Sequence, residues 1–100
     1  MVTASPASHI FFSQQLRLHY IDWRHPDIDD GPVMVLVHGI HDHCRTWDHL
    51  AERFAARYRV IAPDLRGHGD SEWVKGSSYR YLDYIYDLHQ LIDQAGFGPV

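Results

Sequence analysis

The eight residues DLRGHGDS, at positions 64–71, lie one proline after a short apolar run, YRVIA at positions 58–62. A second polar stretch, HGIHDHC at positions 38–44, follows another apolar run, VMVLV at positions 33–37. Apolar runs without alternation are typical of strands that are covered on both faces, as in a parallel sheet. Open α/β sheets bind ligands at the carboxyl ends of their strands. Both polar stretches are therefore predicted to lie at one edge of a sheet.

The chain opens with a predicted hairpin. Apolar residues at 10–12 and alternating apolar residues at 16–20 flank a polar break, which favours two antiparallel strands. Residues 1–8 are small and polar, so we expect a loose terminus there. The segment 24–32 holds two prolines, a glycine and three aspartates, and is predicted to be a solvated loop.

Two helices are predicted after the strands. The first has an apolar stripe from Trp47 to Tyr58, with Thr46 as its N-cap. A long loop at 63–78 leads to the second helix, which Gly96 ends. The stripe of the second helix consists of Leu82, Ile85, Leu88, Leu91, Ile92 and Ala95. Strand, helix, strand and helix after a hairpin indicate an α/β fold.

The composition is that of one soluble domain. The 100 residues are 45% apolar and 22% charged, near the averages for folded proteins. A net charge of −4 argues against a nucleic-acid binder, which needs a basic surface. The one cysteine excludes an intramolecular disulfide, and no apolar run approaches the roughly 18 residues of a membrane span. The first six residues lack the features of a signal peptide, so we expect a cytoplasmic protein.

In this order and spacing, the two polar stretches resemble the first part of an α/β-hydrolase. In that family a His-Gly pair follows the third strand, and Asp-x-Arg-Gly-His-Gly-x-Ser, which residues 64–71 match at every fixed position, follows the fourth. The resemblance implies the N-terminal part of an α/β-hydrolase sheet: an antiparallel hairpin, then two parallel strands with flanking helices. Residues 1–100 would form one incomplete domain that stops before the strand of the nucleophile.

The resemblance also implies roles for the first stretch. Acyl transfer builds negative charge on a carbonyl oxygen, which backbone N–H groups stabilise in an oxyanion hole. One of these donors comes from the loop after the third strand, and here it is the N–H of Ile40. Gly39 is expected to take a conformation that a larger residue would resist. His38 is expected to orient this loop rather than transfer protons.

The second stretch is interpreted as scaffold at the floor of the site. Gly67 and Gly69 are expected to have positive φ in a tight bend. Asp64 and Arg66 are expected to hydrogen-bond across loops, although a contact to substrate stays open as the lesser alternative. The residues assigned to this floor are Asp64, Arg66, Gly67, His68, Gly69 and Ser71.

The 100 residues contain no Gly-x-Ser-x-Gly, the nucleophile motif of the family. The nearest match, residues 69–73, lacks the final glycine. The chain alone is therefore expected to be inactive. An intact relative would hydrolyse an ester-like or related small-molecule bond by Ser-His-Asp chemistry. The alternative is a non-catalytic product, truncated or a pseudoenzyme, with at most a binding role.

Local residues favour the esterase-like branch of the family. Relatives that break carbon–halogen bonds usually have a side-chain donor where this chain has Ile40. Epoxide-opening relatives usually have proline where it has His41. Relatives that cleave carbon–carbon bonds are glycine-rich in this loop, and this chain is not.

Three further groups of residues suggest other kinds of site, and each has a purely structural alternative. A metal cluster is an alternative to solvated histidines at His41, Asp42, His43, Cys44 and His49. A dinucleotide loop is disfavoured because residues 67–72 lack the third glycine. The aromatic residues Trp73, Tyr79, Tyr81, Tyr84 and Tyr86 are more typical of helix packing than of a binding surface. Neither a metal nor a cofactor is expected.

The expected partner is a small-molecule substrate, with neither nucleic acid nor membrane. In the family the strand at 33–37 lies between the strand at 58–62 and the next one along the chain. Without that neighbour it would be an apolar sheet edge, which promotes aggregation. We therefore expect the isolated chain to self-associate.

Overall fold

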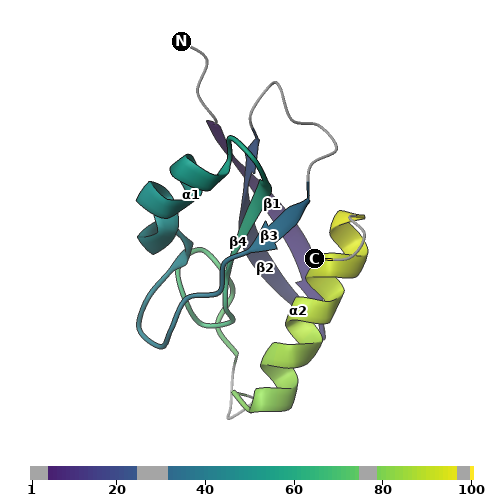
Figure 1. Ribbon diagram of the computed structural model, residues 1–100. Coiled ribbons are helices and arrows are strands. Elements are labelled where there is room, and N and C mark those ends of the chain that lie inside the picture. The colour runs from purple at the N-terminus through teal and green to yellow at the C-terminus, as the bar shows by residue number, and fades with distance from the viewer. Residues whose placement is uncertain (1–4, 25–31, 75–78, 97–99) are drawn as a thin grey trace.

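The computed structural model describes residues 5–24, 32–74, 79–96 and 100. Its four strands form one sheet in the order β1-β2-β4-β3 (Figure 1). β1 (Ser5–Ser13) and β2 (Leu16–Arg24) are antiparallel, and β2 also pairs antiparallel with β4 (Arg59–Asp64). β3 (Val33–Val35) pairs parallel with β4 and lies at the edge of the described sheet. The predicted hairpin and pair of parallel strands are confirmed.

The hairpin is longer than the sequence indicated. Gln14 and Gln15 form its two-residue turn with φ of 50° and 68°, the left-handed conformation that such turns require. Residues 5–8, expected to be loose, are instead paired with residues 21–24. That expectation was wrong because a sheet ladder joins backbone groups, which small polar residues supply as well as apolar ones. Residues 1–4 lie outside the described residues.

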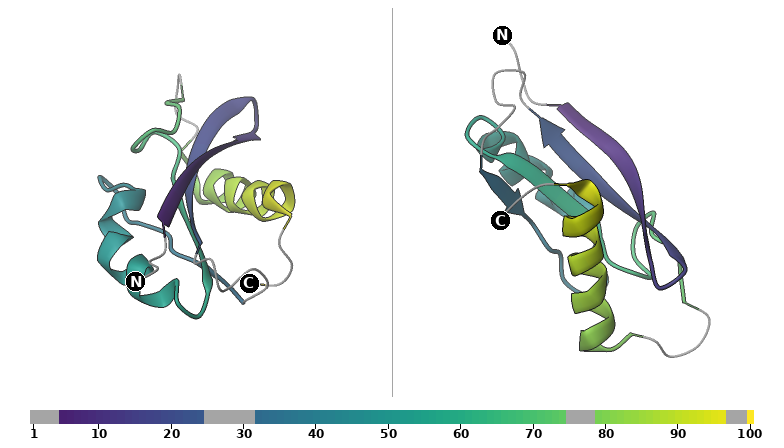
Figure 2. Two further views of the ribbon diagram at one scale, coloured as in Figure 1. Left: turned by 90° about the horizontal axis from the view of Figure 1, so that it is seen from above. Right: turned by 90° about the vertical axis from the view of Figure 1, so that its right-hand side faces the viewer.

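The helices cover opposite faces of the sheet (Figure 2). On one face, the 3₁₀ helix η1 (Cys44–Trp47) leads into α1 (Asp48–Phe54). Thr46 lies inside η1 and caps nothing, because the ring of His43 accepts the Arg45 N–H at its start. A 3₁₀ helix therefore occupies the predicted start, α1 itself begins at Asp48, and it ends at Phe54 rather than at Tyr58.

On the other face, α2 (Tyr81–Ala95) ends at Gly96, whose φ of 73° confirms the predicted stop. Its predicted apolar stripe is only partly buried. Leu91 is fully buried against the sheet, whereas Leu82 and Ile85 are 76% and 59% exposed. Only the carboxyl-terminal part of the stripe therefore contributes to the core.

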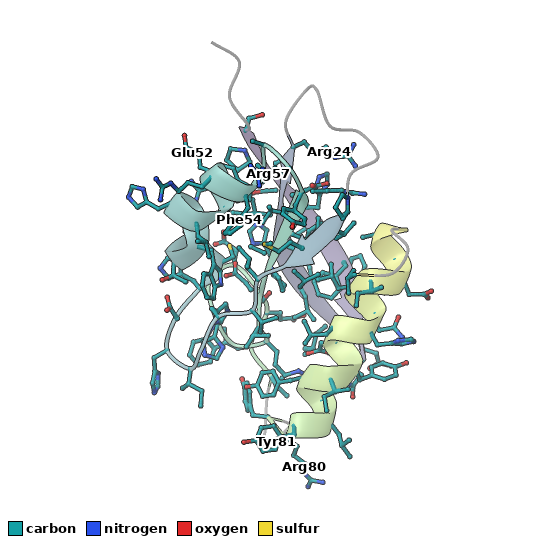
Figure 3. The ribbon with its side chains drawn as sticks, viewed as in Figure 1. Arg24, Glu52, Phe54, Arg57, Arg80 and Tyr81 are labelled. Carbon is teal, nitrogen blue, oxygen red and sulfur yellow. The ribbon has the colours of Figure 1, made fainter. Side chains whose placement is uncertain are left out.

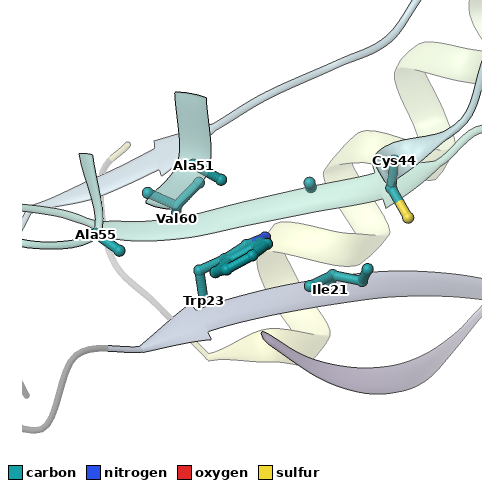
Figure 4. Packing of buried hydrophobic residues seen from close by; sticks show 7 residues of the cluster. Ile21, Trp23, Cys44, Ala51, Ala55 and Val60 are labelled. Carbon is teal, nitrogen blue, oxygen red and sulfur yellow. The ribbon is translucent and has the colours of Figure 1, made fainter. Parts of the chain in front are cut away.

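Alternate residues of the central strands build one apolar cluster on each face. Val60 of β4 and Trp23 of β2 pack with Ala51 and Ala55 under α1 (Figure 4). Ile61, the residue next to Val60, packs on the opposite side under α2. This alternation fixes the register of β4, because a shift by one residue would exchange the two faces. Among the described residues, no helix is long and apolar enough to cross a membrane.

Candidate functional site

The two polar stretches meet beyond the carboxyl ends of β3 and β4. The backbone N–H of Leu65 donates to Nε2 of His38 at 3.0 Å. The N–H of His41 donates to Nε2 of His68 at 3.1 Å. The rings of His38 and His68 lie 5.1 Å apart, centroid to centroid. The structure thus brings together the oxyanion loop, defined here as residues 38–41, and the loop at 65–69.

Ile40 lies at this junction of the two loops and is exposed to solvent. Its side chain is 79% exposed. An open hollow of about 240 Å³ lies beside it, lined by both loops and by Tyr81 and Tyr84 of α2. A neighbouring hollow of about 640 Å³ is lined by Ile40, His68, Tyr79, Arg80, Tyr81 and Tyr84. Figure 3 shows Arg80 and Tyr81 directed away from the sheet at the start of α2.

The loop after β4 is a tight bend. Gly67 and Gly69 have φ of 77° and 51°, as expected. A Cβ atom on Gly67 would come within 2.8 Å of the Tyr79 ring, and one on Gly69 would collide with the carboxylate of Asp64. Ser71 closes the bend, because its hydroxyl donates to the Asp64 carbonyl at 2.6 Å.

Gly39 differs from the expectation. It does not have positive φ, and a Cβ there would meet nothing within 4 Å. The left-handed residue of the oxyanion loop is His41, with φ of 64°. The expected conformational reason for glycine at position 39 was therefore wrong, since His41, two residues further along, makes the bend.

Asp64 is the centre of a buried network. Its carboxylate accepts the N–H groups of Cys44 at 2.7 Å and Asp70 at 3.0 Å, and lies 2.7 Å from Nδ1 of His19. Burial opposes ionisation of this carboxyl, but these hydrogen bonds outweigh it and lower the pKa. Burial, with the nearby Asp64 charge, raises the pKa of the Cys44 thiol to about 12.

Within the described part of the chain, His19, Cys44 and Asp64 are the one group placed to share a metal ion. The alternative metal set proposed from the sequence shares only Cys44 with it. The Asp64 oxygens are already engaged by hydrogen bonds from two backbone N–H groups and by the ring of His19. These three residues therefore fit a hydrogen-bonded network better than a metal centre.

Arg66 is buried and does not line either hollow. Its Nε and Nη2 atoms donate to the two carboxylate oxygens of Asp87 on α2, at 2.6 and 2.7 Å. The hydroxyl of Ser13 donates to the same carboxylate at 2.6 Å. The hydrogen bonds from Arg66 to Asp87 raise the pKa of the guanidinium, so it stays charged. Arg66 thereby joins the loop after β4 to α2.

Sequence reasoning missed two partners in these networks. Asp87 follows Tyr84 by three residues and precedes Leu91 by four, so it is a carboxylate on the buried face of a helix. That position was the available signal for a buried ion pair. His19 gave no such signal, because it reads as the polar member of an alternating strand.

Comparison with known proteins agrees with this geometry. A family model described as serine aminopeptidase, S33, matches residues 30–98. The chain belongs to this family of α/β-hydrolases.

The relatives and solved structures that the chain resembles are named after different activities. Mouse epoxide hydrolase 4 is 34% identical over 84 residues, which cover 83% of this chain and 23% of the relative. Two solved structures match nearly the whole chain. A thioesterase domain from the curacin biosynthetic pathway has a TM-score of 0.84 and 28% identity, over 96% of this chain and 34% of that one. Epoxide hydrolase VrEH1 from Vigna radiata has a TM-score of 0.83 and 30% identity, over 95% and 30%.

The chain spans only part of its relatives' length. It covers between 19% and 30% of eight curated relatives that it matches. The family model matches the part of the chain that holds β3, β4, both helices and both polar stretches, and the hairpin of β1 and β2 lies before it.

Proposed function

We propose that this chain forms the oxyanion side of a serine hydrolase that cleaves an ester-like or related bond of a small molecule. The observation that carries the proposal is the direct hydrogen bonding between the oxyanion loop and the loop at 65–69. It places the exposed Ile40 beside an open hollow at the carboxyl edge of the sheet.

The chemistry follows from this arrangement. A serine oxygen attacks the substrate carbonyl carbon while a histidine takes its proton, and the carbonyl oxygen becomes negatively charged. The N–H of Ile40 donates to that oxygen, with a second donor from the residue after the nucleophile. Neither the serine nor the catalytic histidine is assigned within residues 1–100. Arg66 and Asp64 serve as scaffold because each is buried and hydrogen-bonded to other groups of the protein.

Two comparisons support acyl transfer. The matched family model is described as a serine aminopeptidase, and one solved neighbour is a thioesterase. Both names denote cleavage at a carbonyl carbon.

Epoxide opening is the second candidate, because epoxide hydrolases are among the relatives. The loop itself favours the first. His41 has φ of 64°, whereas the ring of proline, usual at this position in epoxide-opening relatives, holds φ near about −65°. A cytoplasmic location, with no cofactor, remains part of the proposal.

The test compares the full-length gene product with residues 1–100 alone. We expect the full-length product to hydrolyse a p-nitrophenyl ester and to lose that activity to an organophosphorus reagent for serine. Residues 1–100 should show no turnover above buffer. Opening of an aryl epoxide without ester hydrolysis would favour the second candidate. Absence of both activities from the full-length product would favour a non-catalytic role.

A further inference from the structure

His38 and His68 have equivalent hydrogen bonds. Each ring contacts a carbonyl oxygen of its own loop and accepts an N–H from the other loop. Nδ1 of His38 lies 2.7 Å from the carbonyl of Gly39, in its own loop, and its Nε2 accepts the N–H of Leu65 from the other loop. Nδ1 of His68 lies 2.9 Å from the carbonyl of Arg66, again in its own loop. Its Nε2 accepts the N–H of His41 from the other loop.

These partners determine where the protons are. A ring nitrogen that accepts a backbone N–H carries no proton, so Nε2 is bare in both rings. The proton of the neutral imidazole is then on Nδ1, where a carbonyl oxygen accepts it. Both rings are therefore neutral Nδ1–H tautomers, the less common form of free histidine.

The bond from His38 controls one peptide group in particular. The carbonyl of Gly39 and the N–H of Ile40 belong to the same peptide unit. That unit is trans, since the described residues contain no cis peptide bond. In a planar trans peptide the C=O and N–H point in opposite directions. A carbonyl held by His38 therefore leaves the Ile40 N–H pointing away from His38.

The bond to His68 holds the next peptide group. The N–H of His41 is fixed at 3.1 Å from Nε2 of His68, so the units on both sides of Ile40 are anchored. His41 is also in the left-handed conformation, which costs roughly 1–2 kcal/mol for a residue with a side chain. A hydrogen bond at that residue offsets part of this cost.

We propose that His38 and His68 are paired positioning residues that aim the Ile40 N–H, and that protonation of either ring releases the oxyanion loop. This inference rests on the proposed function of Ile40. A protonated ring carries N–H groups at both nitrogens. Its Nε2–H would then face the backbone N–H that it had accepted, and the hydrogen bond between the loops would be lost.

The charged and titratable groups around the pair are few. Arg66 and Asp64, from the same loop, are both buried and engaged with Asp87 and His19. Tyr79, Arg80, Tyr81 and Tyr84 line the hollows on the α2 side. The other carboxylates of the two polar stretches are Asp42, which accepts the His43 N–H, and Asp70, whose backbone N–H donates to Asp64.

The direct test is nitrogen NMR of the imidazole rings in ¹⁵N-labelled protein at about pH 8, above the range in which histidine usually gains its charge. We expect His38 and His68 to show a protonated Nδ1 and a bare Nε2. If self-association broadens the solution signals, solid-state NMR of sedimented protein reads the same nitrogen shifts. A protonated Nε2 on either ring would overturn the proposal.

A second test measures hydrogen exchange of backbone amides in two matched variants, H68F and H68Q. H68F removes the acceptor for His41 N–H, whereas the side-chain oxygen of H68Q can replace it. We expect the protection of the His41 amide to fall about tenfold in H68F and to be largely retained in H68Q. Leu65, held by His38, should stay protected in both. The control is H89F, on the exposed side of α2, which should leave both amides unchanged.

Equal protection of His41 in H68F and in the unmodified protein would contradict the proposal. When the ¹⁵N shifts show that a ring has become protonated on acidification, protection of the amide that this ring accepts, His41 or Leu65, should fall. Unchanged protection beside a protonated ring would refute the release on protonation. Because these measurements need neither substrate nor nucleophile, they separate a failure of the pair from a failure of the proposed hydrolase function.

Discussion

The guanidinium of Arg66 and the carboxylate of Asp87 form two parallel hydrogen bonds, of 2.6 and 2.7 Å, in the interior of the protein. The two residues are 21 positions apart. Their pair ties the loop after β4 to the middle of α2, and Ser13 at the end of β1 adds a third donor. One carboxylate therefore joins the hairpin, the helix and the loop that borders the candidate site.

Removal of the Asp87 charge tests how much stability this junction provides. D87N leaves the Arg66 guanidinium buried without its counter-charge, and we expect a loss of about 3–5 kcal/mol in the free energy of unfolding. The control is D48N, which breaks the exposed pair of Asp48 with Arg45 and should cost less than about 1 kcal/mol. Urea unfolding measures both, and equal small losses would show that the Arg66–Asp87 pair is not a structural junction.

Two glycine substitutions compare a position with a strained backbone, Gly69, with a position that has open space around it, Gly39. G69A places a side chain at φ of 51° and against the Asp64 carboxylate. It should destabilise the fold by more than the roughly 1–2 kcal/mol that the left-handed conformation alone costs. G39A, with nothing within 4 Å of the new Cβ, should change stability by less than about 0.5 kcal/mol. Thermal unfolding followed by circular dichroism distinguishes the two, and a similar loss in both variants would be contrary to this account.

Cys44 should behave as an inert thiol. Burial, with the Asp64 charge, raises its pKa from 9.0 to about 12, so little thiolate forms near pH 8. Labelling with Ellman's reagent should be slow in the native protein and fast in guanidinium chloride. A raised folded-state pKa contributes stability that is present below pH 9 and is lost as the pH rises toward 12. Rapid labelling of the native protein would contradict the buried network around Asp64.

The surface of the described chain predicts self-association. β3 is an edge strand, and α2 exposes large apolar side chains at Tyr81, Leu82 and Ile85. Apolar edges and patches of this kind promote association. Sedimentation velocity of residues 1–100 should show species larger than a monomer, whose share grows with concentration. A compact monomer at all concentrations would oppose this expectation.

The elements that could be predicted from the sequence are those marked by residues close together in the chain. Unbroken apolar runs indicated β3 and β4, and Gly96 marked the end of α2. Gly67 and Gly69 were correctly expected to have positive φ. Features that depend on distant partners were not foreseen. The pairing of residues 5–8 comes from the backbone of β2, and the role of Asp87 depends on Arg66.

The oxyanion loop was likewise only partly predictable from the sequence. Its place beside residues 65–69 followed from the topology of parallel strands. The left-handed conformation fell on His41 rather than Gly39, at the residue whose N–H donates to the ring of His68. A contact between two loops, 27 residues apart along the chain, leaves no periodic pattern in the sequence.

The most direct test of the central claim is replacement of the Ile40 peptide N–H by an ester oxygen in the full-length gene product, followed by measurement of kcat for ester hydrolysis. If this N–H stabilises the oxyanion, kcat should fall by about 10²–10³. The same replacement at Trp73, whose N–H has no hydrogen-bond partner among the described residues, should leave kcat unchanged. An unaltered kcat after the change at Ile40 would contradict the account.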